Sequence, residues 1–384
     1  MGVCSTKGVA ENRKQTFNSK KMLVRQGTKK FFSQSHTDSE SALVKECEKA
    51  FKRQDLALAE KTLPQVQDPS SVKILYQPDW DRHCLNPRHF SFLHLAAGNG
   101  WLGLCKKLIR KFKSRPNVTD DMGFYTPLHF AVGGKHQSVI QYLLEEEKCD
   151  PHCLQFIVTP FQLACTVGNA SIVDYFLSVW NCNPNSFDDF LNTPLHHAVS
   201  RGHLEVVLSL FATGEIRSLH CNKDGDTPLH IAARLGHYHI FVSILSHIEV
   251  NLSRCRNSIG DTPLHEAARH GHLPVIKYIM QAGDFDDIHV INSLGNTPLH
   301  EASSGNHSKI VELLLHEEDH CLLLHNLEGN TPLHLACKKG HLSTAQLLMN
   351  KGFDIHAKNK DNQSPIDVTK PIAKGHLEQL LQQK

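Results

Sequence analysis

One phrase recurs along the chain at almost constant spacing, and its most regular copy reads Gly225-Asp226-Thr227-Pro228-Leu229-His230-Ile231-Ala232-Ala233. The Ser or Thr that opens each copy falls at Ser91, Thr126, Thr159, Thr193, Thr227, Thr262, Thr297, Thr331 and Ser364. The successive intervals are 35, 33, 34, 34, 35, 35, 34 and 33 residues. A period of this length marks supersecondary units that are stable only when they stack on their neighbours. We therefore expect one elongated array in place of the two or three globular domains, roughly, that the length alone would predict.

Each copy encodes two short helices and a turn. Thr227 can cap a helix through its hydroxyl, and Pro228 fits the first helical position, where a missing N–H costs nothing. Small apolar residues then recur at intervals of three and four until Gly236 ends the helix. A second apolar stripe made of Ile240, Ile244 and Leu245 predicts a second helix before the next Gly-Asp turn.

At these residues the chain resembles the ankyrin repeat family, whose signature is the Thr-Pro-Leu-His start, the Gly-His between the helices and a closing Leu-Leu pair. The resemblance spans residues 91 to 384 and implies an all-α ankyrin-repeat solenoid of helix-turn-helix units joined by hairpin-like loops. Three copies are degenerate, namely Ser91-Phe92-Leu93-His94, Thr159-Pro160-Phe161-Gln162 and Ser364-Pro365-Ile366-Asp367. The first and last stand near the ends of the array, where capping units are expected to be atypical.

The N-terminus carries a lipidation pattern. Met1-Gly2-Val3-Cys4-Ser5-Thr6 places a glycine after the initiator methionine and a threonine at the sixth position, as N-myristoylation requires. One myristoyl chain gives only reversible attachment, so stable anchoring needs a second signal. Palmitoylation of Cys4 is one such signal, and a basic arm is another.

Charge is unevenly distributed along the chain. Residues 1–37 hold eight Lys or Arg and one acid, a net charge of +7, which leaves −5 for the remainder because the whole chain carries +2. We expect residues 1–40 to form a disordered basic arm that is attracted to anionic membranes. The same bases also fit a nuclear import signal or a calmodulin target, although Gly27 and the lack of a sustained helical stripe weaken the calmodulin interpretation.

Residues 41–90 precede the repeats. Apolar residues at helical spacing from Ala42 to Leu63 predict a helix pair that caps the array. The following stretch, from Pro64 to Arg88, contains four prolines and predicts an irregular insert. Its Tyr76 and Trp80 are expected to bury this loop against the first repeat.

Chemistry finds little support in the sequence. Thirteen of the 28 histidines recur at two fixed positions of the repeat, three and ten residues after the opening Ser or Thr, so we interpret them as structural. His316-Glu317-Glu318-Asp319-His320 fits a zinc-protease pattern in letters, but it falls where a second helix should end. Cys149-Asp150-Pro151-His152-Cys153 lacks a second close ligand pair. We expect no enzymatic activity, cofactor or metal, and buried free thiols at Cys165 and Cys337.

The repeat register also predicts where a protein partner binds. The resemblance implies a concave face made of the hairpin tips and the exposed side of each first helix. Side chains that vary between copies on this face are Phe130, His197, Ile231, Arg234, Glu266, Arg269, Glu301, Leu335 and Lys338. Apolar, basic and acidic side chains alternate there, which is typical of a protein-binding surface and unlike the basic stripe that nucleic acid requires.

Two functions fit these observations. The first is a non-enzymatic adaptor or scaffold that N-terminal lipidation tethers to the cytoplasmic face of a membrane, the plasma membrane foremost. The second is a soluble ankyrin-type regulator of a signalling or transcription protein, shared between cytoplasm and nucleus, with the basic arm as its import signal. The lipidation motif favours the first.

Overall fold

The computed structural model describes residues 38–66, 69, 72–76, 88–152, 158–248, 250–281, 288–315, 324–371 and 374–375. The chain divides into two compact units, Met1–Gln67 and Asp68–Lys384. The predicted basic arm and its lipidation motif at Gly2 and Cys4 lie outside the described residues. Among those described, no helix has the length and apolar character needed to cross a membrane.

The first unit contains the expected helix pair. Helix α2 runs over Asp38–Lys52, helix α3 over Leu56–Thr62, and a 3-10 turn, η1, over Leu63–Gln65. Helix α3 begins after Asp55, whose carboxylate accepts the N–H of Leu58 at 3.0 Å, as an N-cap residue does. Cys47 Sγ donates to Thr62 Oγ1 at 3.0 Å and joins the two helices. The role of this pair as a cap remains a prediction.

The insert before the first repeat is more regular than expected. Strand β1 (Lys73–Tyr76) pairs in antiparallel fashion with strand β2 (Arg88–Ser91), so an otherwise helical chain carries a small two-stranded sheet. Tyr76 packs edge-on against Phe90, with ring centroids 6.5 Å apart, and lies 6.4 Å from the ring of Phe130. Tyr76 therefore contacts Phe90 and a residue of the second repeat, whereas Trp80 lies outside the described residues. Burial of the insert against the first repeat stays a prediction.

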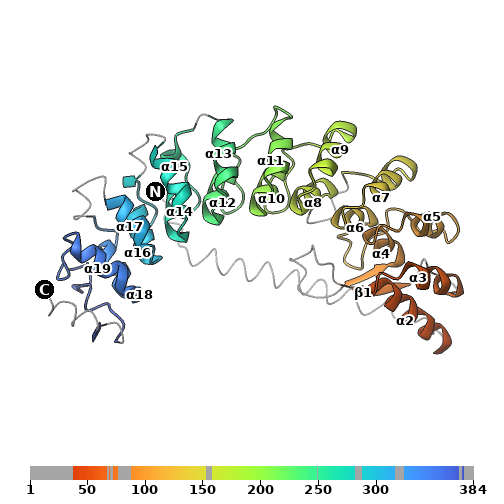
Figure 1. Ribbon diagram of the computed structural model, residues 1–384, viewed down its shortest axis with the longest axis horizontal. Helices are drawn as coiled ribbons and strands as arrows, with labels where there is room; N and C mark the ends of the chain where they lie inside the picture. Colours follow the sequence, from red (N-terminus) through yellow and green to blue (C-terminus); the bar gives the residue numbers. More distant parts are fainter. Residues whose placement is uncertain are drawn as a thin grey trace, which may run out of the picture. The chain divides into compact units, whose positions relative to one another are not determined.

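Eight helix pairs follow, and their first helices lie side by side along the stack (Figure 1). The first helices are α4 (Phe92–Gly98), α6 (Pro127–Gly133), α8 (Pro160–Val167), α10 (Pro194–Ser200), α12 (Pro228–Leu235), α14 (Pro263–His270), α16 (Pro298–Ser304) and α18 (Pro332–Lys339). The second helices are α5 (Leu102–Arg110), α7 (Gln137–Gln141), α9 (Ala170–Trp180), α11 (Leu204–Phe211), α13 (Tyr238–Ser246), α15 (Leu273–Gln281), α17 (Ser308–Leu315) and α19 (Leu342–Asn350). Two short helical turns accompany them, the π-helical η2 (Tyr142–Glu146) after α7 and the 3-10 turn η3 (Leu252–Arg254). The predicted repeat architecture is confirmed.

Helix starts follow from the repeated phrase. In the copy opened by Thr262, this residue has extended backbone, Pro263 occupies the first helical position and His265 completes a capping box. Behind the cap, Ala267 and Ala268 are fully buried, because their small side chains let neighbouring helices approach closely. The predicted register therefore holds for all eight first helices, whose N-caps are Ser91, Thr126, Thr159, Thr193, Thr227, Thr262, Thr297 and Thr331.

The motif histidine links each copy to the following one. The N–H of Thr262 donates to Nδ1 of His265 at 3.3 Å, so this nitrogen carries no proton and Nε2 does. Nε2 then donates to the carbonyl of Asn296 in the next copy at 2.9 Å. The same two bonds recur at His94, His129, His196, His230, His300 and His334. The structural interpretation of these histidines is therefore confirmed.

A second set of histidines bonds in the opposite direction. His272, ten residues after Thr262, contacts the carbonyl of Arg234 in the preceding copy through Nε2 at 2.8 Å. Equivalent bonds of 2.9 to 3.0 Å are made by His136, His203, His307 and His341. Four of the described junctions are thus closed from both sides, by one imidazole that reaches forward and another that reaches back.

Two of the three degenerate copies depart from this scheme, whereas the first keeps both histidine bonds. In the third copy Gln162 replaces the motif histidine; its Oε1 accepts the N–H of Thr159 at 3.0 Å, and its amide donates to Ser186 O at 3.3 Å. The ninth copy does not begin a regular helix, because residues 365–368 form a turn. There Asp367 accepts the N–H and hydroxyl of Ser364 at 2.9 and 2.7 Å.

Candidate partner-binding surface

Six of the side chains predicted to face a partner directly follow a motif histidine, namely Phe130, His197, Ile231, Glu266, Glu301 and Leu335, and three of them are instead buried. Phe130 packs against the rings of Phe90 and His94, with centroids 4.6 and 5.3 Å away. Glu266 and Glu301 are only 2% and 6% exposed. A partner cannot reach these side chains in the folded stack, so the expectation needs correction at these positions.

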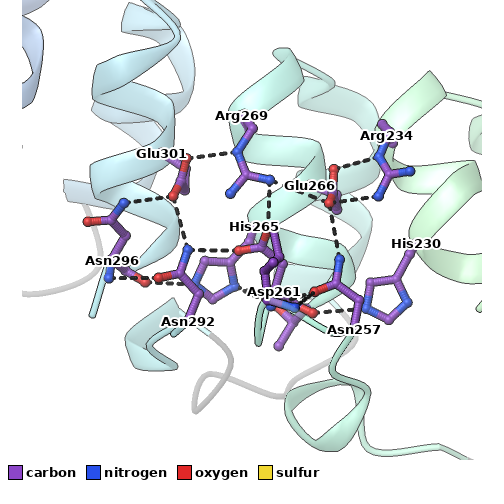
Figure 2. Close-up of polar contacts among 12 residues, drawn as sticks. His230, Arg234, Asn257, Asp261, His265, Glu266, Arg269, Asn292, Asn296 and Glu301 are labelled. Atoms are coloured by element: carbon purple, nitrogen blue, oxygen red, sulfur yellow. Dashed lines mark hydrogen bonds and ion pairs between the residues drawn. The ribbon is translucent and has the colours of Figure 1, made fainter. Parts of the chain in front are cut away.

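The two buried glutamates bind the arginines that sequence analysis also assigned to the partner surface (Figure 2). Arg234 donates from Nε and Nη2 to Glu266 at 2.8 and 2.9 Å, and its Nη1 lies 2.7 Å from Asp226. Arg269 repeats the arrangement one copy later, with Glu301 at 2.8 Å and Asp261 at 2.6 Å. Each arginine therefore joins its own hairpin to the next repeat.

Buried amides complete this network. Asn292 donates from Nδ2 to Asp261 at 2.8 Å and to Glu301 at 3.1 Å, and Asn296 donates to Glu301 at 2.8 Å (Figure 2). Burial alone would raise the pKa of the Glu301 carboxyl, but the hydrogen bond and charge of Arg269 outweigh it and hold that pKa below its usual value. Glu266 and Asp226 raise the pKa of the Arg234 guanidinium. Burial opposes the same effect at Arg269, but Glu301 and Asp261 outweigh it and raise that pKa too. The charged groups of this network are paired with one another, so its principal effect is to fix the stack.

The other residues predicted to contact a partner differ in how exposed their side chains are. His197 is half-buried, and its Nε2 lies 3.1 Å from the buried carboxylate of Asp188. Ile231 and Leu335 are half-buried, whereas Lys338 is exposed. These four side chains, together with the outer edges of Arg234 and Arg269, stay available as a proposed contact surface.

Sequence analysis missed a row of aliphatic side chains on the hairpin tips. Ile259, Leu294 and Leu327 belong to three consecutive hairpins and are 55%, 62% and 60% exposed. Ile291, on the approach to the middle hairpin, is also exposed. We call these four residues the aliphatic tip row. An exposed cluster of large apolar side chains is a recognised mark of a protein-binding site.

Backbone hydrogen bonds hold these tips in line. The N–H of Ser293 donates to the carbonyl of Ile259 at 2.9 Å, and the N–H of Leu327 donates to the carbonyl of Leu294 at 3.0 Å. The apolar side chains therefore start from a backbone that packing and hydrogen bonding have already fixed. A partner that binds there does not have to order three independent loops, which lowers the entropy cost of association.

A second apolar tip lies on an earlier hairpin. Phe187, Phe190 and Leu191 are exposed, and the carbonyl of Phe190 accepts the N–H of Lys223 from the next hairpin at 2.9 Å. Leu191 has a φ of +60°, a left-handed conformation for which equivalent hairpins use glycine, as at Gly260. A branched side chain held there is strained by about 1 kcal/mol, and such strain concentrates at functional sites.

A signal for these tips was present in the sequence. In the fourth to ninth copies, the residues three positions before the opening Thr or Ser are Phe190, Asp224, Ile259, Leu294, Glu328 and Asp361. Leu327 stands one position earlier, beside Glu328. An Asp or Asn recurs two positions before the varying residue, because this Asp or Asn accepts the N–H bonds that close the turn, as Asn292 does for Leu294 and Asn296. The turn does not require a large apolar residue at the varying position, so its presence there indicates an exposed contact residue.

Candidate chemical sites remain unsupported by geometry. Among the described residues, no group of three or more His, Cys, Asp or Glu side chains is placed to hold a metal ion. Cys153 and the segment 316–320 lie outside the described residues. Cys165 and Cys337 are buried free thiols, as expected; burial raises the pKa of both, that of Cys337 to about 11, which makes them unreactive.

Comparison with known families decides the relationship of the chain. A family model of ankyrin repeats matches residues 65–155, 147–218, 214–288 and 284–359, which together cover most of the sequence. The chain belongs to the ankyrin repeat family. Ankyrin repeats bind protein partners and are interaction modules, so the fold supports protein binding as the general function.

Similar stretches occur within much longer ankyrin-containing proteins. Glycerophosphocholine phosphodiesterase gde1 of Schizosaccharomyces pombe is 31% identical over 139 residues, which is 34% of this chain and 12% of that protein. Neurogenic locus notch homolog protein 1 is 32% identical over 133 residues in Danio rerio and 30% identical in Mus musculus, in each case 34% of this chain and 5% of that protein. The ankyrin chain thus matches only a small part of these relatives, and their whole-protein activities do not transfer with the repeats.

Proposed function

We propose that this ankyrin protein is a non-enzymatic adaptor, held at the cytoplasmic face of a membrane by lipidation of Gly2 and Cys4, that binds a protein partner through the aliphatic tip row. The observation that carries the binding site is the aligned exposure of Ile259, Leu294 and Leu327 on hydrogen-bonded hairpins. Large apolar side chains that lose their remaining contact with water on binding supply most of the affinity at protein interfaces.

The partner is expected to present an apolar stripe that covers several tips at once. Each tip has a large aliphatic residue and a polar neighbour, such as Ser258 beside Ile259 and Ser293 beside Leu294. This arrangement resembles an apolar centre with a polar rim, which is the usual composition of transient interfaces. The half-buried Ile231 and Leu335 and the exposed Lys338 lie on the first helices and extend the proposed surface.

A matched pair of triple variants tests the binding site. The first is Ile259→Ser, Leu294→Ser and Leu327→Ser. The control is Val179→Ser, Leu208→Ser and Leu235→Ser, which removes three similarly exposed apolar side chains away from the tips. Proteins cross-linked to the chain in cells should fall by about tenfold or more with the tip variant and persist with the control. Equal recovery with both variants would remove the tip row from the proposal.

Membrane attachment is supported by the myristoylation pattern at Gly2 and Thr6, the adjacent Cys4 and the surplus of bases in residues 1–37. Gly2→Ala should release the protein into the cytosol, because the first acyl chain is lost. Cys4→Ser should leave a weak attachment that high salt disrupts, because one chain and the bases remain. Intact-mass measurement of the N-terminal peptide provides the direct check. An unacylated terminus, with unchanged localisation of Gly2→Ala, would instead favour a soluble ankyrin-type regulator.

A further inference from the structure

The first repeat has an unusually basic outer helix. Residues 101–119, which include α5 and the loop after it, contain six Lys or Arg and no Asp or Glu. Such a run is uncommon in a chain whose residues after 37 are net acidic. Five of the six bases fall into two groups, Lys106 and Arg110 on α5, and Lys111, Lys113 and Arg115 on the loop after it.

One group is neutralised by the second repeat. Lys106 Nζ lies 3.1 Å from Glu146, and Arg110 Nη2 lies 2.7 Å from the other oxygen of the same carboxylate. Both cations also lie over the ring of Tyr142, at 4.8 and 6.0 Å from its centroid. These two bases contribute to the junction between α5 and η2.

The other group lies on the loop after α5 and forms what we call the basic corner, Lys111, Lys113 and Arg115. All three side chains are exposed, and none has an ion-pair partner among the residues that the structure describes. Lys111 Nζ lies 5.6 Å from the ring centroid of Phe112, which is half-buried between the bases. The corner therefore presents three uncompensated charges around a partly exposed aromatic ring.

The backbone of the basic corner is fixed. Ser114 is buried, and its N–H donates to the carbonyl of Leu108 at 3.0 Å. Lys113, with a φ of +55°, supplies the left-handed residue that lets the chain leave the helix. Val118 closes the turn by donating to Arg115 O at 3.1 Å. The three bases consequently project from a built turn and hold their relative positions.

We infer that the basic corner is a docking site for an anionic lipid surface. Exposed bases on a turn meet a plane of negative charge without needing a groove, and lysine stems with an adjacent aromatic ring suit the membrane interface. A protein partner would require a larger apolar centre than the half-buried Phe112 provides. A nucleic acid would require bases that continue as a track, whereas the next bases along α5 are already paired with Glu146.

This contact is independent of the proposed acyl chains, so protein made without lipidation can test it. Sedimentation with vesicles of pure phosphatidylcholine, and of phosphatidylcholine with about 30% phosphatidylserine, would measure partitioning of the full chain. The test variant is Lys111→Gln, Lys113→Asn and Arg115→Gln, with Asn chosen because it tolerates the left-handed backbone. The control is Lys339→Gln, Lys351→Gln and Lys360→Gln, which removes the same charge from exposed positions between Thr331 and Ser364.

Partitioning onto the phosphatidylserine vesicles should fall on the order of 100-fold for the test variant, since each base near an anionic leaflet strengthens binding by about fivefold. Partitioning of the control should stay within about twofold of the wild type, because its substitutions lie outside the basic corner. The N-terminal bases are the same in both variants, so they do not affect the comparison. Equal losses for the two variants would show that only net charge matters and overturn the proposal. Loss of binding to a polyglutamate peptide without loss of vesicle binding would also overturn it, in favour of an acidic protein. Matching thermal unfolding curves would show that both variants are folded.

Discussion

Arg269 Nε lies 2.8 Å from Oε2 of Glu301, thirty-two residues away, and this ion pair joins two consecutive repeats through side chains alone. Because Glu301 is buried and Asp261 binds the same guanidinium, the charge of Arg269 is satisfied within the stack. Charged residues that alternate along a repeat surface can therefore serve the scaffold rather than a ligand.

Removing this arginine should be costly. Arg269→Met leaves the buried carboxylates of Asp261 and Glu301 without their cation, so we expect the free energy of unfolding to fall by about 3 kcal/mol. Arg269→Lys should lie between this variant and the wild type, because an ammonium cannot bridge both carboxylates in the same geometry. Urea unfolding measures the difference. Lys339→Met, an exposed change on the first helix α18, should stay within about 0.5 kcal/mol of the wild type.

The motif histidines predict acid sensitivity. Burial lowers the pKa of His94 to about 3 and that of His129, His196 and His300 to about 4, whereas the pKa of a histidine in an unfolded chain is about 6.5. The unfolded chain therefore binds more protons below pH 6.5, and stability falls as the pH drops from about 6.5 towards 4. Each such histidine should contribute a loss of about 2 kcal/mol between pH 7.5 and 5.

A single substitution separates this effect from the titration of carboxylates. His300→Gln copies the solution found at Gln162, which caps its helix without a titratable ring. The free energy of unfolding of this variant, measured with urea, should fall less between pH 7.5 and 5 than that of the wild type. The difference should be about 2 kcal/mol, the contribution of one histidine. An unchanged pH dependence would show that His300 does not remain neutral in the folded chain.

The strained backbone at Leu191 predicts that a substitution there can stabilise the folded chain. Leu191→Asn should stabilise the chain by about 1 kcal/mol, since asparagine accepts a positive φ and Asn362 already occupies the equivalent position. The reverse change, Gly260→Leu, should destabilise it, because a Cβ there would come within 2.9 Å of Ser293 N. Thermal unfolding of both variants tests the pair, and a destabilised Leu191→Asn would contradict the assignment of strain.

The hydroxyl at the opening position should account for much of each helix start. Thr262→Val keeps the buried volume of Thr262 but loses the hydroxyl that lies 2.9 Å from His265 Nδ1, so we expect a loss of about 1 to 2 kcal/mol. Thr262→Ser retains the hydroxyl and should cost less. Urea unfolding of the two variants side by side measures the contribution of the cap, and equal losses would assign it to the methyl group instead.

Sequence analysis predicted the helix starts well because the interactions are local. Thr262, Pro263 and His265 lie within four residues, and the amino-acid types alone specify the cap. The role of Glu301 could not be predicted in this way, since its partner Arg269 is set by the register between repeats and a lone Glu on a helix usually faces water.

The strand pair was missed for a related reason. Lys73–Tyr76 is short, and its pairing with Arg88–Ser91 depends on tertiary contacts such as that of Tyr76 with Phe90. The tip row was missed because it is defined by exposure and by alignment across repeats. In the sequence, Ile259 and Leu294 look like ordinary turn residues. Only the backbone hydrogen bond from Ser293 to Ile259 shows that their hairpins lie side by side.

The third copy lacks both junction histidines, and this omission weakens its junction with the second copy. Asn169 stands where other copies place the histidine that reaches back, and it caps α9 instead, so this copy is joined to its predecessor by the forward bond from His129 to Val158. In a one-dimensional array, nearest-neighbour coupling sets where a boundary between folded and unfolded segments costs least. The junction beside Thr159 is one place where such a boundary is expected, and if it forms there, the segment with the basic corner can open while the copies with the aliphatic tip row stay folded.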